Sequence, residues 1–377
     1  MPPSYPAART IAPKVRDHFV RHIAQARAHG RTDVAVEPDA EALEAVIDAA
    51  FWASLRREEG ATPRVSLVLL EPAEAPQPMR FAEYLPLHPA ALARLAPAVE
   101  RPGIHLGVCA IDGRLMVWGT TRTIPAFCPV VEVVTSGLLV VKYRHETFGK
   151  FVNVAVLEGD QIKMVDEAFV YQPDCPRPVR ALLGFDPMPD REGPIDILVQ
   201  LAASMRAHGR GGALLVVSAG EPGWRESIVE PVLYRVEPPY TALAELVRRE
   251  GTEAESHEWQ EDLRRAVDAI AGLTAVDGAT VITTAYELVA FGAKITRRRG
   301  HPLVRRVMVT EPIEGAQAFI ATPAQLGGTR HLSAAQFVSD QRDAIALVAS
   351  QDGRFTIVKW SPVDGLVHAH RVEALLL

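Results

Sequence analysis

The stretch GGTRHLSAAQFVSDQRDAIALVASQDGRFTIVKW (residues 327–360) runs from a glycine pair into an amphipathic segment and then into two apolar runs. The amphipathic segment predicts a helix with Thr329 as its N-cap, and the two runs predict strands joined by a hairpin at Asp352-Gly353. The unsatisfied N–H groups of the first helical turn, the helix dipole and the Arg330 guanidinium all favour an anion. An ordinary capped helix on the surface is the alternative.

The rest of the C-terminal half alternates between helical and strand patterns. GGALLVVS (residues 211–218) is a short continuous apolar run, typical of a strand that is buried on both faces. SHEWQEDLRRAVDAIAGL (residues 256–273) has helical spacing and begins with Ser256 as a candidate N-cap. We therefore predict that residues 195–377 form an α/β domain with a mixed sheet flanked by helices.

The N-terminal half changes from a helical to a strand period. Residues 1–60 read as a helical segment in which Asp39 is a candidate N-cap, and residues 61–171 read as a β-meander domain packed with that segment. The meander covers roughly residues 104–166 and turns at Asp112-Gly113, Ser136-Gly137 and Gly159-Asp160. A small closed barrel and a single sheet covered by the helices both remain open. The Pro-rich residues 172–194 predict a stiff, irregular connector, so the overall fold class is α+β.

Composition limits the classes of function. The chain has 377 residues with 48% hydrophobic residues and a net charge of −6, which allows two or three domains and does not favour nucleic acid or an acidic membrane as a partner. The arginine-rich stretch TRRRGHPLVRR (residues 296–306) is either a solvated loop or a phosphate contact. Three cysteines without metal-ligand spacing, and no signal or membrane segment, lead us to expect a soluble, cytoplasmic protein.

A second motif, Asp277-Gly278-Ala279, stands at a predicted strand edge. An aspartate there can hold a divalent cation or accept a proton from a hydroxyl, and the small residues beside it allow a ligand to approach the backbone. Taken alone, this tripeptide is most often a turn. His331 could contact a phosphate or a metal, whereas His368 and His370 are expected to be exposed strand residues.

These motifs, in this order and spacing, resemble the diadenylate cyclase (DAC) domain of the DNA-integrity-scanning and membrane-bound c-di-AMP synthases. Members have a GALIVI-like strand, a DGA motif and a GTRHR sequence that leads into a helix. This chain has GGALLVV from Gly211, VDGATVI from Val276 and GGTRHL from Gly327, followed by SDQRDAIALV from Ser339. The resemblance extends over roughly residues 195–360.

The resemblance implies a reaction and a site. Enzymes of this family join two ATP molecules through attack of each 3′-hydroxyl on the partner's α-phosphate, with facing domains in a homodimer and Mg²⁺ or Mn²⁺. It implies that Asp277 and His331 are the catalytic and metal-binding residues. The implied nucleotide-binding residues are Gly278, Ala279, Gly328, Thr329, Arg330, His331 and Ser339.

The chain also departs from the cyclase pattern. The second arginine of the family is Leu332 here, and the Ser-Glu is Ser339-Asp340. Loss of one hydrogen bond to a charged group, about 1.5–3 kcal/mol, slows a reaction by roughly 10- to 150-fold. The whole chain is more similar to the DACNV group, regarded as sensors that receive a nucleotide signal.

Three functions follow from these similarities. The leading prediction is a sensor or effector that binds an adenine nucleotide or a cyclic dinucleotide. An active diadenylate cyclase and a non-binding interaction domain are the alternatives.

Overall fold

The computed structural model describes residues 4–58, 60–145, 151–185, 196–220, 222–249 and 256–377. The chain divides into two compact units. Unit 1 comprises Met1–Val165 together with Leu377, and unit 2 comprises Asp166–Leu376. Both units combine helices with a mixed sheet, which confirms the α+β fold class.

Unit 1 contains an eight-stranded sheet in the order β2-β4-β3-β1-β5-β6-β7-β8. Its helices are α1 (Pro6–Ala28), α2 (Ala40–Ser54) and α3 (Pro89–Val99). Its strands are β1 (Ser66–Leu69), β2 (Met79–Pro86), β3 (His105–Ile111), β4 (Arg114–Thr121), β5 (Pro129–Thr135), β6 (Leu138–Arg144), β7 (Phe151–Glu158) and β8 (Gln161–Met164). As predicted, Asp39 caps α2, since its carboxylate accepts a hydrogen bond from the Ala42 N–H.

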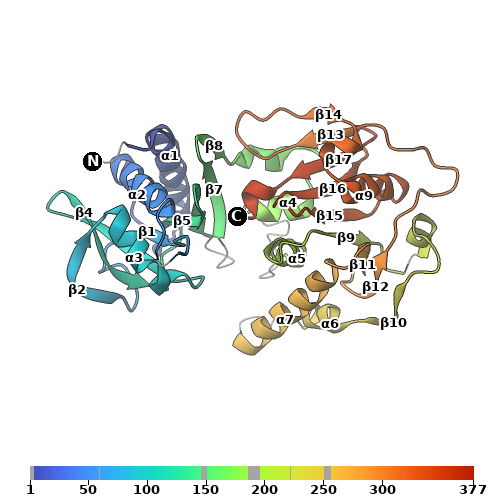
Figure 1. Ribbon diagram of the computed structural model, residues 1–377, viewed down its shortest axis with the longest axis horizontal. Helices are drawn as coiled ribbons and strands as arrows, with labels where there is room; N and C mark the ends of the chain where they lie inside the picture. The colour runs from blue at the N-terminus through green and yellow to red at the C-terminus, as the bar shows by residue number, and fades with distance from the viewer. Residues whose placement is uncertain (1–3, 59, 146–150, 186–195, 221, 250–255) are drawn as a thin grey trace. The chain divides into compact units, whose positions relative to one another are not determined.

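The predicted meander is wrong in one respect. The three hairpins form, but β1 lies between β3 and β5, parallel to β3 and antiparallel to β5. Hairpin patterns show only which neighbouring segments pair, and β1 enters the sheet from outside the predicted 104–166 stretch. The structure has an open sheet whose helices α1 and α2 contact strands β5, β6 and β7 (Figure 1).

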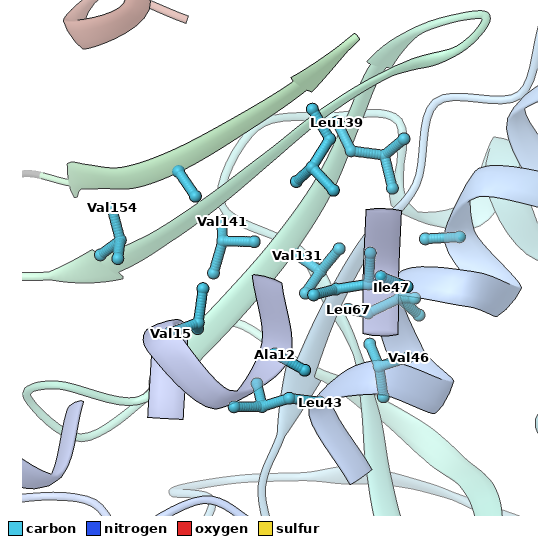
Figure 2. Close-up of a cluster of buried hydrophobic side chains, with 14 of the residues drawn as sticks. Ala12, Val15, Leu43, Val46, Ile47, Leu67, Val131, Leu139, Val141 and Val154 are labelled. Atoms are coloured by element: carbon cyan, nitrogen blue, oxygen red, sulfur yellow. The ribbon is translucent and has the colours of Figure 1, made fainter. Parts of the chain in front are cut away.

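The core of unit 1 lies between these helices and one face of the sheet (Figure 2). Val15 of α1 and Ile47 of α2 point toward Leu67 of β1 and Val141 of β6, and all four side chains are fully buried. Burial of an aliphatic side chain of this size stabilises the fold by about 1.5–3 kcal/mol. The apolar side chains that recur with a helical period in residues 40–54 and with a strand period in residues 138–144 therefore pack in one apolar layer.

Unit 2 contains a nine-stranded sheet in the order β10-β12-β11-β9-β15-β16-β17-β13-β14. Its helices are η1 (Glu167–Tyr171), α4 (Arg177–Leu182), α5 (Ile197–Ala207), η2 (Pro222–Ser227), α6 (Ala242–Arg248), α7 (His257–Leu273), α8 (Pro323–Leu326), α9 (Thr329–Asp340) and η3 (Glu373–Leu375). Its strands are β9 (Gly212–Val217), β10 (Tyr234–Tyr240), β11 (Ala279–Thr283), β12 (Leu288–Ala293), β13 (Val307–Thr310), β14 (Phe319–Ala321), β15 (Ile345–Ala349), β16 (Phe355–Ser361) and β17 (Leu366–Arg371).

Strand β9 is an interior strand of this sheet and is buried along its whole length, as its apolar sequence predicts. Helix α9 packs on the face that carries Leu215, and its Phe337 is fully buried against that face. Helices α5 and α7 pack on each other and contact the sheet through β15 and β12 (Figure 1). Ser256 caps α7 by accepting a hydrogen bond from the Trp259 N–H, as predicted.

Some expectations differ from the structure of unit 2. The units divide at Val165, and the first part of the predicted connector is ordered, with residues 177–182 forming α4; its residues 186–194 lie outside the described part of the chain. His368 and His370 are buried, not exposed, because β17 is an interior strand between β16 and β13. Exposure of a strand residue depends on its neighbours in the sheet, which the local sequence does not specify.

Candidate functional site

A cavity of about 650 Å³ lies at one end of the strands of the unit 2 sheet, where the parallel strands β9 and β11 begin. We call this end of the strands the edge of the sheet. Ala213 and Ala279 are directly paired across these two strands and line the cavity. Strand β15 runs antiparallel to β9, so its last residue, Ala349, reaches the same edge. Small side chains at these three positions leave space for a ligand.

The N-terminus of α9 closes another side of the cavity. Gly328, Thr329 and Arg330 all line it, and the N-cap is Gly328, not the predicted Thr329. The helix starts at Thr329, one residue earlier than a Thr329 cap requires, so Thr329 lies within the first turn. Because Gly328 has no side chain to accept from the first N–H groups, the N–H groups of Thr329 and Arg330 are available to a bound anion, whereas the His331 N–H donates to the Gly328 carbonyl.

Arg330 adds a full positive charge at this helix end. A Cβ on Gly211 would lie 3.2 Å from an Arg330 guanidinium nitrogen, so the arginine lies close to the loop that precedes β9. The charge of Arg330 also helps to lower the pKa of Asp277. Arg330 therefore links the helix end to the DGA motif electrostatically.

Asp277 is an exposed carboxylate at the site. It forms an ion pair with Lys294, which follows β12 and also lines the cavity. The hydrogen bond and the charge of Lys294 lower the pKa of Asp277, so the carboxylate is ionised at neutral pH. An exposed, ionised carboxylate is suited to a hard divalent cation such as Mg²⁺ or Mn²⁺.

Gly278 is required by close packing of the backbone. Its φ is +113°, and a Cβ there would lie 2.5 Å from the carbonyl carbon of Gly292 on β12. Only glycine fits this position without a shift of the strand. The DGA motif thus allows the β11 and β12 backbones to approach directly beside Asp277 and Lys294.

His331 lies at the inner wall of the cavity and is only 2% exposed. Its Nε2 is 3.3 Å from the Thr356 hydroxyl, and a Cβ on Gly327 would lie 2.6 Å from its Nδ1. Burial lowers the pKa of His331, so the ring is neutral at neutral pH. The ring therefore holds the glycine loop against β16, and its enclosure suits a metal ligand less well than the open carboxylate of Asp277.

The structure brings together most of the residues singled out from the sequence. The cavity is lined by Asp277, Gly278, Ala279, Gly328, Thr329, Arg330 and His331. Ser339 is not among its lining residues, because it lies near the far end of α9. Leu332 is also outside the lining, with its side chain 39% exposed.

Sequence reasoning missed Lys294 and the turn that follows β15. Ser350, Gln351 and Asp352 line the cavity, and the Ser350 hydroxyl donates to Asp352 and lowers the pKa of that carboxyl. Both segments follow strands that run antiparallel to β9 and β11, and so end where those strands begin. The sequence does show a polar residue directly after each of these strands. That pattern indicates a site residue only when it is known which strands pair.

A family model described as "Probable sensor domain DACNV" matches residues 32–122. This match lies within unit 1 and does not include the cavity of unit 2. A comparison with curated proteins gave no match. In the described part of the chain, none of the helices has the length and apolar character needed to cross a bilayer.

Proposed function

We propose that unit 2 is the nucleotide-binding part of a sensor or effector protein and binds an adenine nucleotide or a cyclic dinucleotide. The observation that carries this proposal is the cavity in which the open N-terminus of α9, Arg330, Lys294 and the Asp277 carboxylate face one space. The match to a probable sensor domain in unit 1 supports the sensing role.

Each part of the cavity suits one part of such a ligand. The N–H groups of α9 and the Arg330 guanidinium suit phosphate oxygens, since a helix end and a forked donor both favour anions. A volume of about 650 Å³ lies within the usual range for small-molecule sites, roughly 300–1,000 Å³. The row of small residues at Ala213 and Ala279 gives a flat base or ribose access to the sheet edge.

A divalent cation would be held by Asp277 and the phosphates of the ligand. Mg²⁺ is usually bound through one or two carboxylates plus substrate phosphates, and it supplies charge neutralisation there. Lys294 now pairs with Asp277, and both side chains are largely exposed, at 54% and 89%. Such a pair is screened by water, so a cation can replace Lys294 and free it for a phosphate.

An active diadenylate cyclase is the second candidate, favoured by Asp277. An ionised, exposed carboxylate beside the cavity is what a metal-assisted attack by a 3′-hydroxyl requires. Leu332 is the opposing feature, since the resemblance places an arginine at that position.

The deciding experiment incubates the purified protein with ATP and Mg²⁺ or Mn²⁺ and follows nucleotide retention and products by mass spectrometry, with Asp277→Asn as the control. Nucleotide that is retained without formation of a product supports the proposed sensor or effector function. Cyclic di-AMP that disappears with Asp277→Asn identifies a cyclase, and the absence of both retention and product contradicts nucleotide binding altogether.

Leu332→Arg tests whether the missing arginine limits catalysis. If it does, this variant makes cyclic di-AMP at least tenfold faster than the wild-type chain, because an arginine can add a charged hydrogen bond to phosphate. Leu303→Arg, at another exposed leucine of unit 2, is the matched control. A rate that is unchanged or lower in Leu332→Arg contradicts this explanation.

A further inference from the structure

The two sheets repeat one topology. Counted from one edge strand, the order is β2-β4-β3-β1-β5-β6-β7 in unit 1 and β10-β12-β11-β9-β15-β16-β17 in unit 2. In both series the third and fourth strands are parallel, and every other neighbouring pair is antiparallel. A helix precedes the first strand of each series along the chain, α2 before β1 and α5 before β9. Helix α3 joins β2 to β3, and helices α6 and α7 join β10 to β11.

Two register shifts also occur at equivalent places in the two sheets. In unit 1 the pairing of β2 with β4 shifts between Arg80 and Leu85, opposite Gly119 and Val117. In unit 2 the pairing of β10 with β12 shifts by the same amount between Arg235 and Tyr240, opposite Ala290 and Leu288. Bulges are specific features of a sheet, and a shared bulge within a shared strand order indicates two copies of one fold.

A second shared bulge sets the correspondence residue by residue. Gly107 and Val108 of β3 pair with Gly119 and Val117, as Val281 and Ile282 of β11 pair with Ala290 and Leu288. Counting back along the paired strands, Ser66 corresponds to Ala213, His105 to Ala279 and Gly103 to Asp277. The edge of unit 1 that corresponds to the cavity of unit 2 is therefore defined.

That edge differs from the unit 2 cavity in three features. Residues 122–128, all described, join β4 to β5 without a helix, whereas residues 294–344 join β12 to β15 and include α9. Gly103 offers no carboxylate at the position of Asp277. The paired Ala213 and Ala279 of the cavity are replaced by Ser66 and His105.

Ser66 and His105 close this edge. The Ser66 hydroxyl lies 2.7 Å from His105 Nδ1, and the two residues are 7% and 2% exposed. The His105 ring contacts Phe151 edge-on, at 5.8 Å between ring centroids, and Lys142 pairs with Glu132 at 2.5 Å nearby on β6 and β5. Burial, followed by the charge of Lys142, lowers the pKa of His105 to about 4, so the ring is neutral at neutral pH.

We propose that unit 1 is a second copy of the fold of unit 2 in which the Ser66–His105 pair closes the nucleotide edge, so that each chain binds one nucleotide, in unit 2. The residues matched by the probable sensor domain model run from before α2 to the end of β4 and lie within this closed copy. The stoichiometry rests on the proposed function, whereas the closed edge does not.

The experiment combines calorimetric titration with thermal unfolding of the full chain. Titration of ATP with Mg²⁺, and separately of cyclic di-AMP, should give one site in the wild type and none in an Asp277→Ala, Arg330→Ala double variant. One full site that persists in the double variant and is lost in His105→Ala overturns the proposal. If neither compound binds the wild type, the proposed function has failed and the closed edge is decided by unfolding alone.

Unfolding tests the closed edge without a ligand. His105→Ala, and the milder Ser66→Ala in case the first variant does not fold, should lower the Tm of unit 1 by at least about 5 °C, since a buried hydrogen-bonded pair is lost. His29→Ala, at an exposed histidine of the same unit whose ring bonds the Gln25 carbonyl, should lower the Tm far less. Unchanged Tm values in both Ser66→Ala and His105→Ala show an open edge and overturn the proposal.

Discussion

At the scale of single residues, the candidate site depends on which charges face the cavity. Asp277 and Lys294 neutralise each other at its rim, while Arg330 stands at the helix end. A lysine that already has a carboxylate partner attracts phosphate less strongly than a free one does. Binding of a metal to Asp277 would therefore strengthen phosphate binding by releasing Lys294.

Lys294→Met tests this exchange. The substitution removes the hydrogen bond and the charge that lower the pKa of Asp277, so that pKa rises toward its ordinary value. It also removes the cation that competes with a metal. We expect Mn²⁺ alone to bind more tightly, by electron paramagnetic resonance, and ATP to bind at least tenfold more weakly.

The control for this exchange is Lys163→Met, a lysine substitution in unit 1. Equal affinities for Mn²⁺ and ATP in Lys294→Met and Lys163→Met contradict the exchange.

Arg330→Ala tests the phosphate contact. Loss of a charged hydrogen bond of about 1.5–3 kcal/mol should weaken nucleotide binding at least tenfold. The matched control is Arg342→Ala, because Arg342 stacks over Trp360 and does not line the cavity. Calorimetric titration checks the result, and an affinity unchanged in Arg330→Ala excludes this arginine from the site.

At the scale of elements, α9 packs into the core of unit 2 through one face and lines the cavity with its N-terminus. Ala334, Phe337 and Val338 are fully buried in the core of unit 2, while Thr329 and Arg330 face the cavity. The buried face fixes where the N-terminus points, because the helix cannot turn without exposing these side chains. Packing in the middle of the helix thus positions the donors at its start.

Phe337→Ala should therefore affect both stability and binding. Truncation of a buried phenylalanine costs about 3–5 kcal/mol, and loosening of α9 should weaken nucleotide binding as well. Denaturant unfolding and titration measure the two effects. Leu43→Ala, in the core of unit 1, should cost about 2–5 kcal/mol without weakening nucleotide binding. Equal loss of affinity in the two variants contradicts a specific role for α9.

At the scale of the whole molecule, each unit encloses at least one neutral histidine. Burial lowers the pKa of His105 to about 4 in unit 1 and the pKa of His370 to about 3 in unit 2, where the Thr310 hydroxyl lies 2.7 Å from its Nδ1. Unfolding exposes both rings and returns each pKa to about 6.5. Between pH 6.5 and pH 4 the unfolded chain therefore takes up protons that the folded chain does not.

Both units should consequently lose stability as the pH falls through this window. For His105 the loss between pH 6.5 and pH 4 is roughly 3 kcal/mol, and the stability is restored as the pH rises. Denaturant unfolding at several pH values measures it. His105→Asn should reduce the response of unit 1 alone and His370→Asn that of unit 2 alone, where His331 keeps its own contribution, with His29→Asn as the exposed control. A response that remains equally steep in all three variants contradicts this account.

The sequence by itself determined the fold class and most of the local elements, because helical and strand periods, caps and tight turns depend on neighbouring residues. Asp39 and Ser256 cap their helices as predicted, and the strand runs at residues 211–218 and 345–349 form β9 and β15. The candidate motifs around Asp277 and Arg330 were also visible locally. Their placement in one cavity was an expectation drawn from a resemblance, not from the residues.

Tertiary structure alone decided which distant segments meet. In the folded chain β1 lies between β3 and β5 and His370 is buried. His331 lies beside the Thr356 hydroxyl, and Lys294 forms an ion pair with Asp277. These outcomes depend on strand pairing and helix packing across long sequence separations, where many local patterns compete for the same partner. The repeat of the fold emerged only from strand order and bulges for the same reason: hydrogen-bonded register is a property of pairs of strands, and a single segment does not contain it.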